Sequence, residues 1–457
     1  MSVISKFAQK LIKNGYVARF NSLKNVPIFY SLELDQLVEN YISNNCDERL
    51  INEDIKEIID NLKQNKVIVP NLKYDDEILN AIINTIPKPY PSILYLIMTE
   101  KCNFACDYCF IERYMDQKKT NTMTIEIADK AIDFYVRQIK KDPSRFNEKK
   151  EILFYGGEPL LNFEVVKFCA QKINQYKKEG LLPKDTSMGM VTNGTFVTDG
   201  VAKELNELGI SFSISLDGAT LEANSCRKYK NGKLGYEDII KAVETAKKNN
   251  SDFGLSMTLS QEALKESDKI FELIDKYEIK SMGFNILLTD KKYSVPDEYF
   301  VNASKFIIEA FKKFRNKGVY EDRAMRKVNA FVKHDLHLQD CAAEGGNQLV
   351  IAPNGDVGLC QGYLSTRETF VTNINDFDFK TDENPVFLDW NKRTPLRMEK
   401  CLNCIALGTC GGGCALNAKS NGSSIWDLDE RFCIHSKSII EFLVWDLFDI
   451  LMKNEKE

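Results

Sequence analysis

The chain has 457 residues and a mass of 52.3 kDa, a length that predicts about three domains at roughly 150 residues each. Its 61 Lys and Arg residues against 66 Asp and Glu residues give a net charge of −5, so no overall positive field attracts nucleic acid or an anionic membrane. The start lacks a signal peptide, and the longest apolar segment, residues 439–452, is shorter than the ~20 residues of a membrane span. We therefore expect a cytoplasmic protein that binds neither nucleic acid nor membranes.

The first predicted domain, residues 1–91, combines a strand pair with helices. Two short apolar runs flank a polar turn and predict a β-hairpin, and apolar residues at helical spacing predict two helices behind it. The strands are Tyr16–Phe20 and Pro27–Tyr30, and the helices lie near Leu34–Ile42 and Ile55–Leu62. This order indicates a small winged-helix-like module.

The second predicted domain, residues 92–330, alternates strands with amphipathic helices. Six βα units predict an α/β fold with a parallel sheet, and six is fewer than the eight of a complete TIM barrel, so we expect an open, partial (β/α)6 barrel. The predicted strands are Ile93–Met98, Glu151–Tyr155, Met188–Thr192, Ser211–Leu216, Gly254–Leu259 and Ser281–Leu287. The predicted helices are Thr124–Lys140, Phe163–Lys178, Asp199–Leu208, Tyr236–Lys248, Leu264–Tyr277 and Asp297–Arg315.

The last part of the chain has a different character. Residues 331–438 hold seven cysteines and show little periodicity, so we expect ligand bonds rather than a large apolar core to organise them. Residues 439–457 predict a C-terminal helix. Its stretch up to Met452 is apolar nearly all round, which indicates that the helix is buried or covered by a partner.

Cysteine is the most informative residue, with 13 copies against three histidines. Disulfides are rare in a reducing cytosol, so clustered thiols indicate metal binding or catalysis. Cys102, Cys106 and Cys109 form a C-x3-C-x2-C array directly after the first predicted barrel strand. Three thiolates on one loop suit a cubane iron–sulfur cluster with one open iron, because four cysteines are the usual number. A zinc loop with a distant fourth ligand is the alternative.

With Tyr108 at its aromatic position, this array resembles the signature of the radical S-adenosylmethionine (SAM) superfamily. The resemblance implies a [4Fe–4S] cluster whose open iron binds SAM. It also implies oxidoreductase chemistry, in which reductive cleavage of SAM gives methionine and a 5′-deoxyadenosyl radical.

Polar and glycine residues at the ends of the next predicted strands support this interpretation. By resemblance, the Gly-Gly-Glu run contacts the SAM methionine amine, and the later residues lie near its ribose or carboxylate. Each motif alone is also compatible with an ordinary turn or, for the arginine, a surface position. Together they fall at the carboxyl ends of parallel strands, where barrels place active sites. The candidates are Gly156, Gly157, Glu158, Asn193, Ser215, Asp217 and Arg227.

The seven later cysteines resemble the SPASM domain pattern at every position, with zinc sites as the alternative. The resemblance implies two auxiliary [4Fe–4S] clusters, for three clusters in all. By motif position, auxiliary cluster II is held by Cys401, Cys404, Cys410 and Cys433, and auxiliary cluster I by Cys341, Cys360 and Cys414.

Auxiliary cluster I is one ligand short in this assignment. His337 or Asp335 could complete it, or the open iron could accept a substrate thiolate, a soft ligand suited to iron. Among the lone cysteines, Cys226 is a candidate donor or acceptor of a hydrogen or proton in the loop above the barrel. Cys46 and Cys169 fit small core or surface positions in helices.

The N-terminal module resembles the PqqD-like recognition element of enzymes that modify ribosomally made peptides (RiPPs), although a purely structural cap is also possible. That element recruits a leader peptide as an added edge strand. The resemblance thus implies a peptide maturase that abstracts hydrogen from a precursor peptide and forms an oxidative crosslink, foremost a cysteine thioether. Carbon–carbon crosslinking, formylglycine formation as in anaerobic sulfatase maturation, and a non-enzymatic metal scaffold are the alternatives. A flavodoxin or ferredoxin is the implied electron donor.

Overall fold

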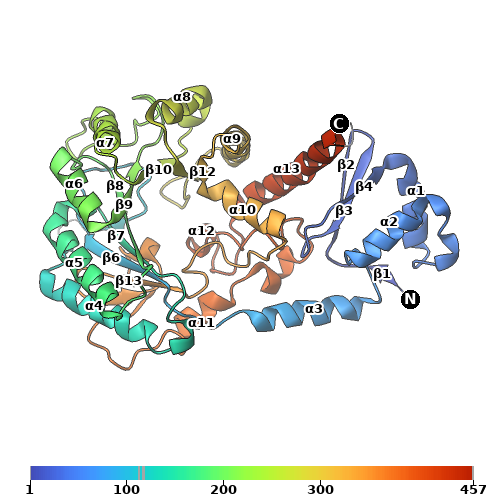
Figure 1. The fold of residues 1–457 in the computed structure, drawn as a ribbon, viewed down its shortest axis with the longest axis horizontal. Coiled ribbons are helices and arrows are strands. Elements are labelled where there is room, and N and C mark those ends of the chain that lie inside the picture. Colours follow the sequence, from blue (N-terminus) through green and yellow to red (C-terminus); the bar gives the residue numbers. More distant parts are fainter. Residues whose placement is uncertain (1, 112–113, 116–118, 455–457) are drawn as a thin grey trace.

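The computed structural model describes residues 2–111, 114–115 and 119–454. A large α/β body is joined to a smaller N-terminal module, and two helices, α3 (Leu72–Thr85) and α13 (Glu430–Asn454), run from one to the other (Figure 1). In the part of the chain that is described, no helix is both long enough and apolar enough to cross a membrane.

The N-terminal module contains more strands than the two that the sequence predicts. The predicted hairpin is confirmed, and a further strand, residues 8–13, pairs with its first arm. The sequence did not reveal this strand, because its residues are only half-buried and carry a weak apolar signal. Its antiparallel sheet has the order β2 (Ala8–Lys13), β3 (Tyr16–Asn21), β4 (Ile28–Ser31), and β1 (Val3–Ile4) pairs with β5 (Ile68–Val69). Its other helices are α1 (Leu32–Ser43) and α2 (Glu53–Gln64).

The module's sheet is covered on both faces. One face buries Val17 and Tyr30 against α1 and α2, and α2 begins where the Asn52 side chain accepts a hydrogen bond from the Ile55 amide, 3.2 Å away. The other face carries Tyr16 and Phe29, which pack on aromatic side chains of α13. The C-terminal helix is therefore covered by the N-terminal module.

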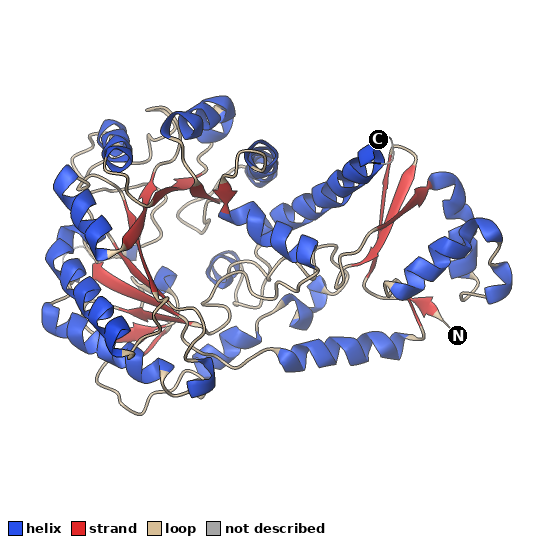
Figure 2. Cartoon of the chain, in the orientation of Figure 1, coloured by secondary structure: helices blue, strands red, loops and turns tan. Residues whose placement is uncertain are grey.

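The body is built on one sheet of ten strands (Figure 2). Strands β6–β11 are parallel neighbours in chain order and confirm the six predicted strands. Since β12 and β15 lie at opposite ends of the strand order, the sheet is open rather than closed. Its strands are β6 (Ile93–Thr99), β7 (Glu151–Gly156), β8 (Ser187–Thr192), β9 (Ile210–Ser215), β10 (Phe253–Thr258), β11 (Ser281–Asn285), β12 (Tyr320–Glu321), β13 (Gln348–Ile351), β14 (Asp356–Gly358) and β15 (Phe370–Asn373).

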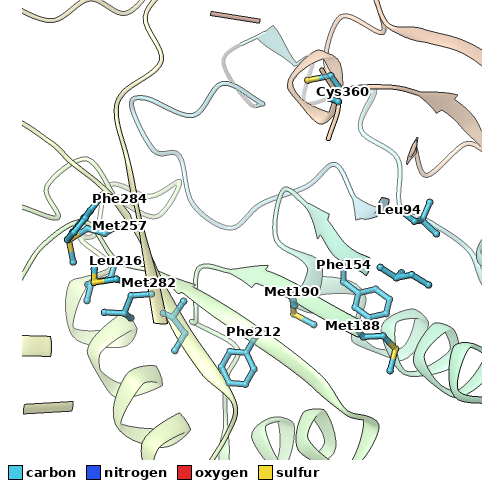
Figure 3. Close-up of a cluster of buried hydrophobic side chains, with 14 of the residues drawn as sticks. Leu94, Phe154, Met188, Met190, Phe212, Leu216, Met257, Met282, Phe284 and Cys360 are labelled. Atoms are coloured by element: carbon cyan, nitrogen blue, oxygen red, sulfur yellow. The ribbon is translucent and has the colours of Figure 1, made fainter. Parts of the chain in front are cut away.

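Helices cover the outer face of this sheet (Figure 1). Alternate strand residues, such as Phe154, Met190 and Phe212, point into the core beneath them (Figure 3). The helices are α4 (Ile125–Ile139), α5 (Phe163–Glu179), α6 (Asp199–Leu208), α7 (Tyr236–Lys248), α8 (Ser267–Tyr277), α9 (Glu298–Phe314) and α10 (Asp322–Lys333).

The last part of the chain extends the sheet and then becomes irregular. Strand β13 pairs in parallel with β6, and β14 and β15 follow it antiparallel. Beyond them, loops and short 3₁₀ turns separate α11 (Pro385–Lys392), α12 (Ala415–Asn421) and α13. Helix α13 begins at Glu430, earlier than the sequence predicts. The residues before Ile439 are mostly polar, so they carry no apolar signal from which this start could be predicted.

Candidate functional site

The first cysteine loop, residues 102–109, follows β6 and lies against residues 226–230. The Ala105 amide donates to the Lys228 carbonyl (2.7 Å), and the Asp107 amide to the Cys226 carbonyl (3.3 Å). Burial raises the pKa of the Cys106 thiol far above its usual value, and the neighbouring Cys109 and Cys102 thiols raise it further. Three thiols that disfavour one another's ionisation suit a cationic metal centre, which would stabilise all three thiolates.

Two glycines at the end of β7 leave room for the backbone that leads into the first cysteine loop. Gly156 has a φ of +136°, and a Cβ on either Gly156 or Gly157 would lie 2.2 Å from a carbonyl oxygen, that of Thr99 or Lys101 respectively. The sequence predicts close approach to a ligand at these glycines. In the structure they also give close approach to the backbone that leads into Cys102.

Glu158 ties two strand ends together. Its fully buried carboxylate accepts hydrogen bonds from the Thr192 hydroxyl (2.7 Å), the Asn193 amide (2.7 Å) and the Leu160 amide (3.1 Å). Burial raises the pKa of Glu158 to about 7, and the three donors oppose that rise. The adjoining Asn193 side chain contacts the first cysteine loop rather than solvent.

Arg227 forms a buried ion pair with Asp217, 2.9 Å apart, so it is not a surface arginine. The Tyr108 hydroxyl donates to the same carboxylate, and the guanidinium lies 5.6 Å from the Tyr108 ring centroid. The positive charge of Arg227 also opposes the effect of burial on the pKa of Cys106. The structure therefore brings three predicted residues together beside the first cysteine loop.

Polar residues on β10 and β11 complete the inner face of the sheet. Ser215 pairs in register with Ser256, whose hydroxyl accepts a hydrogen bond from the Asn285 side chain at 3.0 Å. Neither Ser256 nor Asn285 was expected from the sequence. Their signal is the alternation of polar with apolar residues at the ends of the last two parallel strands.

Cys226 is half-buried in the segment under the first cysteine loop. Burial raises the pKa of its thiol to about 11, and the nearby Asp107 carboxylate contributes in the same direction. The side chain is therefore a neutral thiol near neutral pH. That state suits the donation of a hydrogen atom or proton and does not suit nucleophilic attack.

The seven later cysteines form two groups in space. The charge of Cys414 raises the pKa of both Cys341 and Cys360. Cys414 therefore lies with these two thiols and apart from the cysteines that precede it in sequence. In the same way, Cys410 raises the pKa of Cys401, Cys404 and Cys433, so these four thiols lie together. We call these groups the Cys341 set (Cys341, Cys360 and Cys414) and the Cys401 set (Cys401, Cys404, Cys410 and Cys433).

A buried ion pair that the sequence did not reveal fixes the Cys341 set. Arg393 is fully buried and donates to Glu344 (3.1 Å) and to the carbonyls of Gly412 (2.9 Å) and Gly413 (3.1 Å). Glu344 in turn accepts a hydrogen bond from the Ala415 amide at 2.8 Å, one residue beyond Cys414. The pair thus holds the glycine run and the chain around Cys414 in one arrangement.

A second buried cation links the two cysteine sets. The Lys327 ammonium group donates to the Asp340 carboxylate (2.9 Å) and to the Cys410 carbonyl. Asp340 immediately precedes Cys341 in the chain. On the other side, Asp429 accepts a hydrogen bond from the Cys414 amide at 3.0 Å. Each set is therefore anchored by charges on neighbouring helices and turns.

The two residues suggested as a fourth ligand of the Cys341 set, His337 and Asp335, differ in burial and in contacts. Asp335 is exposed, and the ring of His337 is directed to Asp340, with 3.8 Å between Nε2 and Oδ1. Glu344 is the charged residue whose carboxylate acts on all three thiols of the set. It is already engaged by Arg393 and backbone amides.

The thiol groups fit clusters of several atoms better than single ions. Among the described residues, no three His, Cys, Asp or Glu side chains converge tightly enough to hold one metal ion. Cys341 is exposed to solvent. Thiols that do not converge on one point suit an iron–sulfur cluster, in which several iron and sulfide atoms lie between the cysteine ligands.

A cavity of about 270 Å³ adjoins both cysteine regions. Its lining includes Phe110 and Tyr114, which follow the first cysteine loop, and Leu288, which lies beyond β11. It also includes Gly362 and Leu416, each two residues after a member of the Cys341 set. A bound molecule would therefore touch the surroundings of both.

Comparison with known proteins agrees with this geometry. Residues 96–274 match the family described as the radical SAM superfamily, a range that contains the first cysteine loop and every predicted strand-end residue. The radical SAM cyclopropyl synthase TigE of Paramaledivibacter caminithermalis is 26% identical over 372 residues, which cover 77% of this chain and 73% of TigE.

Two solved structures share the α/β fold with its large, mostly parallel sheet. Native anSMEcpe with bound AdoMet and Cp18Cys peptide has a TM-score of 0.64 at 20% identity and covers 79% of this chain and 98% of its own. Streptococcus suis SuiB bound to precursor peptide SuiA has a TM-score of 0.54 at 15% identity, covering 95% of this chain and 100% of its own. The predicted α/β class is therefore confirmed.

Proposed function

Because the chain belongs to the radical SAM superfamily through residues 96–274, we propose that it is a peptide maturase that oxidatively crosslinks a ribosomally made precursor peptide. The bond proposed is a thioether between a cysteine sulfur and a carbon. The observation that carries this proposal is the cavity that adjoins both the first cysteine loop and the Cys341 set. A peptide there would lie between the site of radical formation and thiols able to hold an electron acceptor.

The first cysteine loop would hold a [4Fe–4S] cluster through Cys102, Cys106 and Cys109. When bound, the cluster and SAM supply an electron and a 5′-deoxyadenosyl radical that removes hydrogen from the substrate. Arg227, oriented by Asp217, provides positive charge for the SAM carboxylate. The remaining SAM contacts are proposed to come from Tyr108, Gly156, Gly157, Glu158, Asn193 and Ser215.

The second cysteine region resembles the SPASM pattern and would hold two more [4Fe–4S] clusters. The Cys401 set supplies four thiolates, whereas the Cys341 set supplies three, and Glu344 is occupied by Arg393 and backbone amides. A substrate thiolate is a soft ligand suited to the remaining position, and metal binding would favour its ionised form. This arrangement supports sulfur as one partner of the new bond.

The N-terminal module would bind the leader of the precursor peptide. Its sheet ends in two outer strands, β2 and β4, at which an extended peptide could add a further strand. Helices α3 and α13 connect the module with the second cysteine region, which would hold the leader at a fixed distance from the cavity. The match to the structure of SuiB bound to precursor peptide SuiA, which extends over 95% of this chain, supports a peptide-binding role for the module.

Carbon–carbon bond formation is the second candidate function. The 26% identity to a protein named as a cyclopropyl synthase, over 77% of this chain, favours it. The two candidates share hydrogen abstraction and differ in whether a cysteine thiol is consumed.

The test is anaerobic reconstitution with iron, sulfide, SAM, a low-potential reductant such as a flavodoxin or ferredoxin, and cysteine-bearing precursor peptides encoded beside the gene. A product that has lost two hydrogens and no longer reacts with iodoacetamide supports the thioether. The same loss with a free thiol supports carbon–carbon bonding. An aldehyde at the cysteine position would instead identify formylglycine formation, and the absence of SAM cleavage would leave only a metal scaffold.

A further inference from the structure

Three side chains next to the first cysteine loop form a closed ring of hydrogen bonds. The Asn103 amide donates to the Thr195 hydroxyl (2.9 Å), which donates to the Asn193 oxygen (2.7 Å). The Asn193 amide nitrogen completes the ring by donating to the Asn103 oxygen at 2.8 Å. The ring joins the cysteine loop to the end of β8.

The same Asn193 nitrogen also contacts a cysteine sulfur. Its Nδ2 lies 3.8 Å from the Sγ of Cys102, which accepts a second bond from the Phe104 backbone amide at 3.4 Å. Both distances are within the range of N–H···S hydrogen bonds, because sulfur is larger than oxygen. The Cys102 sulfur is therefore faced by the Phe104 backbone donor and the Asn193 side-chain donor, and it also lies 3.9 Å from the Asn103 side-chain oxygen.

The orientation of the Asn193 amide is fixed by its other partners. Its oxygen accepts from both the backbone amide (3.0 Å) and the hydroxyl of Thr195, so only the nitrogen faces Cys102. The backbone of Asn193 is held by Glu158, through a 2.7 Å bond to its amide. These hydrogen bonds hold the amide nitrogen of Asn193 toward Cys102.

We propose that Asn193 raises the reduction potential of the cluster held by Cys102. Reduction adds one electron to a cluster whose sulfurs already carry negative charge, and a hydrogen-bond donor at a ligand sulfur stabilises the reduced state more than the oxidised state. Asn193 thus acts on the cluster through its sulfur ligand, in addition to any contact with SAM. The inference rests on cluster binding at the first cysteine loop and not on the identity of the crosslink.

The experiment measures the potential of this cluster in reconstituted full-length protein by an EPR redox titration without SAM, followed by SAM addition to identify its signal. Asn193→Leu removes the donor at nearly constant volume and is expected to lower the ratio of reduced to oxidised cluster about tenfold at a fixed potential, a shift of about 59 mV for one electron. Asn193→Asp places a carboxylate near the sulfur and is expected to lower it further.

Thr195→Val is the matched control, because it opens the ring but leaves the Asn193 donor beside Cys102. In this variant, the ratio of reduced to oxidised cluster at a fixed potential is expected to stay within about twofold of the ratio in the unaltered protein. An unchanged potential in Asn193→Leu, with iron content intact, would overturn the proposal. Equal shifts in Thr195→Val and Asn193→Leu would also overturn it, since loop disorder would then be the cause. A change in reduction potential that Asn193→Leu shows only with SAM bound would overturn the proposal as well, because Asn193 would then act on SAM and not on the cluster. Peptide turnover enters none of these measurements.

Discussion

The two cysteine regions of this protein are held in place by different interactions. The first cysteine loop is supported by backbone contacts, with Gly157 packed against the chain before Cys102 and residues 226–230 paired beneath the loop. The second region is largely irregular, and buried charges such as Arg393 and Glu344 fix it. A sheet edge thus positions ligands by its regular geometry, whereas irregular chain requires individual polar anchors whose partners are all satisfied.

The largest expected effects are losses of activity, and they should show that the two cysteine regions support different steps of the reaction. Cys106→Ala should lose SAM cleavage completely, because the first cysteine loop would keep only two thiols. Cys404→Ala should still cleave SAM but yield no crosslinked peptide. Chromatographic detection of 5′-deoxyadenosine and mass spectrometry of the peptide make the comparison. Loss of SAM cleavage in both variants, with iron content lowered only locally, would contradict a division of labour between the regions.

Arg393→Met should show that the second region depends on its buried ion pair. The variant leaves the Glu344 carboxylate buried without its partner, which should cost about 3–5 kcal/mol of unfolding free energy. Denaturant unfolding and iron content of the reconstituted protein measure the effect. Lys130→Met, which breaks the exposed pair with Glu126, is the control and should cost no more than about 0.5 kcal/mol. Similar losses of unfolding free energy in both variants would contradict the role of the buried Arg393–Glu344 pair as an anchor.

Glu158 should give the first region a characteristic pH dependence. Its pKa is about 7 in the folded protein against 4.5 for the free side chain, so the folded state binds the proton more tightly. This contribution to stability is present below about pH 4.5 and declines as the pH rises to about 7, by about 3 kcal/mol. Glu158→Gln should flatten unfolding free energy measured over that interval. The exposed Glu164→Gln should leave it unaltered, and equal slopes for all three proteins would refute the assignment.

The Phe448→Ala substitution tests whether aromatic packing on α13 holds the N-terminal module against the rest of the protein. The Phe448 ring lies 4.7 Å from Tyr16 and 5.2 Å from Phe29, between ring centroids. Its loss should weaken the contact by about 1–3 kcal/mol and speed limited proteolysis of the N-terminal module. The exposed Ile450→Ala is the control. If the two variants are cleaved at the same rate, α13 does not hold the module.

Much of the fold could be predicted because its signal is local. The six parallel strands and the helices that follow them each carry their own periodicity, so Ile93–Thr99 and Asp199–Leu208 were recognisable without their neighbours. Strand β2 was missed because half-buried Lys and Gln residues mask its alternation. The division of the seven later thiols, with Cys414 apart from the cysteines before it, was implied by the resemblance to the SPASM pattern and not by any local periodicity.

The anchors of the site could not be predicted, for a physical reason. Arg393 and Glu344 are 49 residues apart, and nothing in either local sequence marks a buried ion pair. The contact of Asn193 with Cys102 likewise depends on two strand ends meeting in space. Interactions of this kind are determined by tertiary packing, which leaves no local pattern.

The central claim is tested most directly by following both products of one anaerobic reaction. The protein, its clusters reconstituted, is incubated with SAM, reductant and the precursor peptide, and 5′-deoxyadenosine and peptide mass are quantified together. We predict that 5′-deoxyadenosine accumulates in step with a peptide that has lost two hydrogens and carries one new intramolecular bond. SAM cleavage that leaves every candidate peptide unmodified, with leader and core both present, would contradict the account.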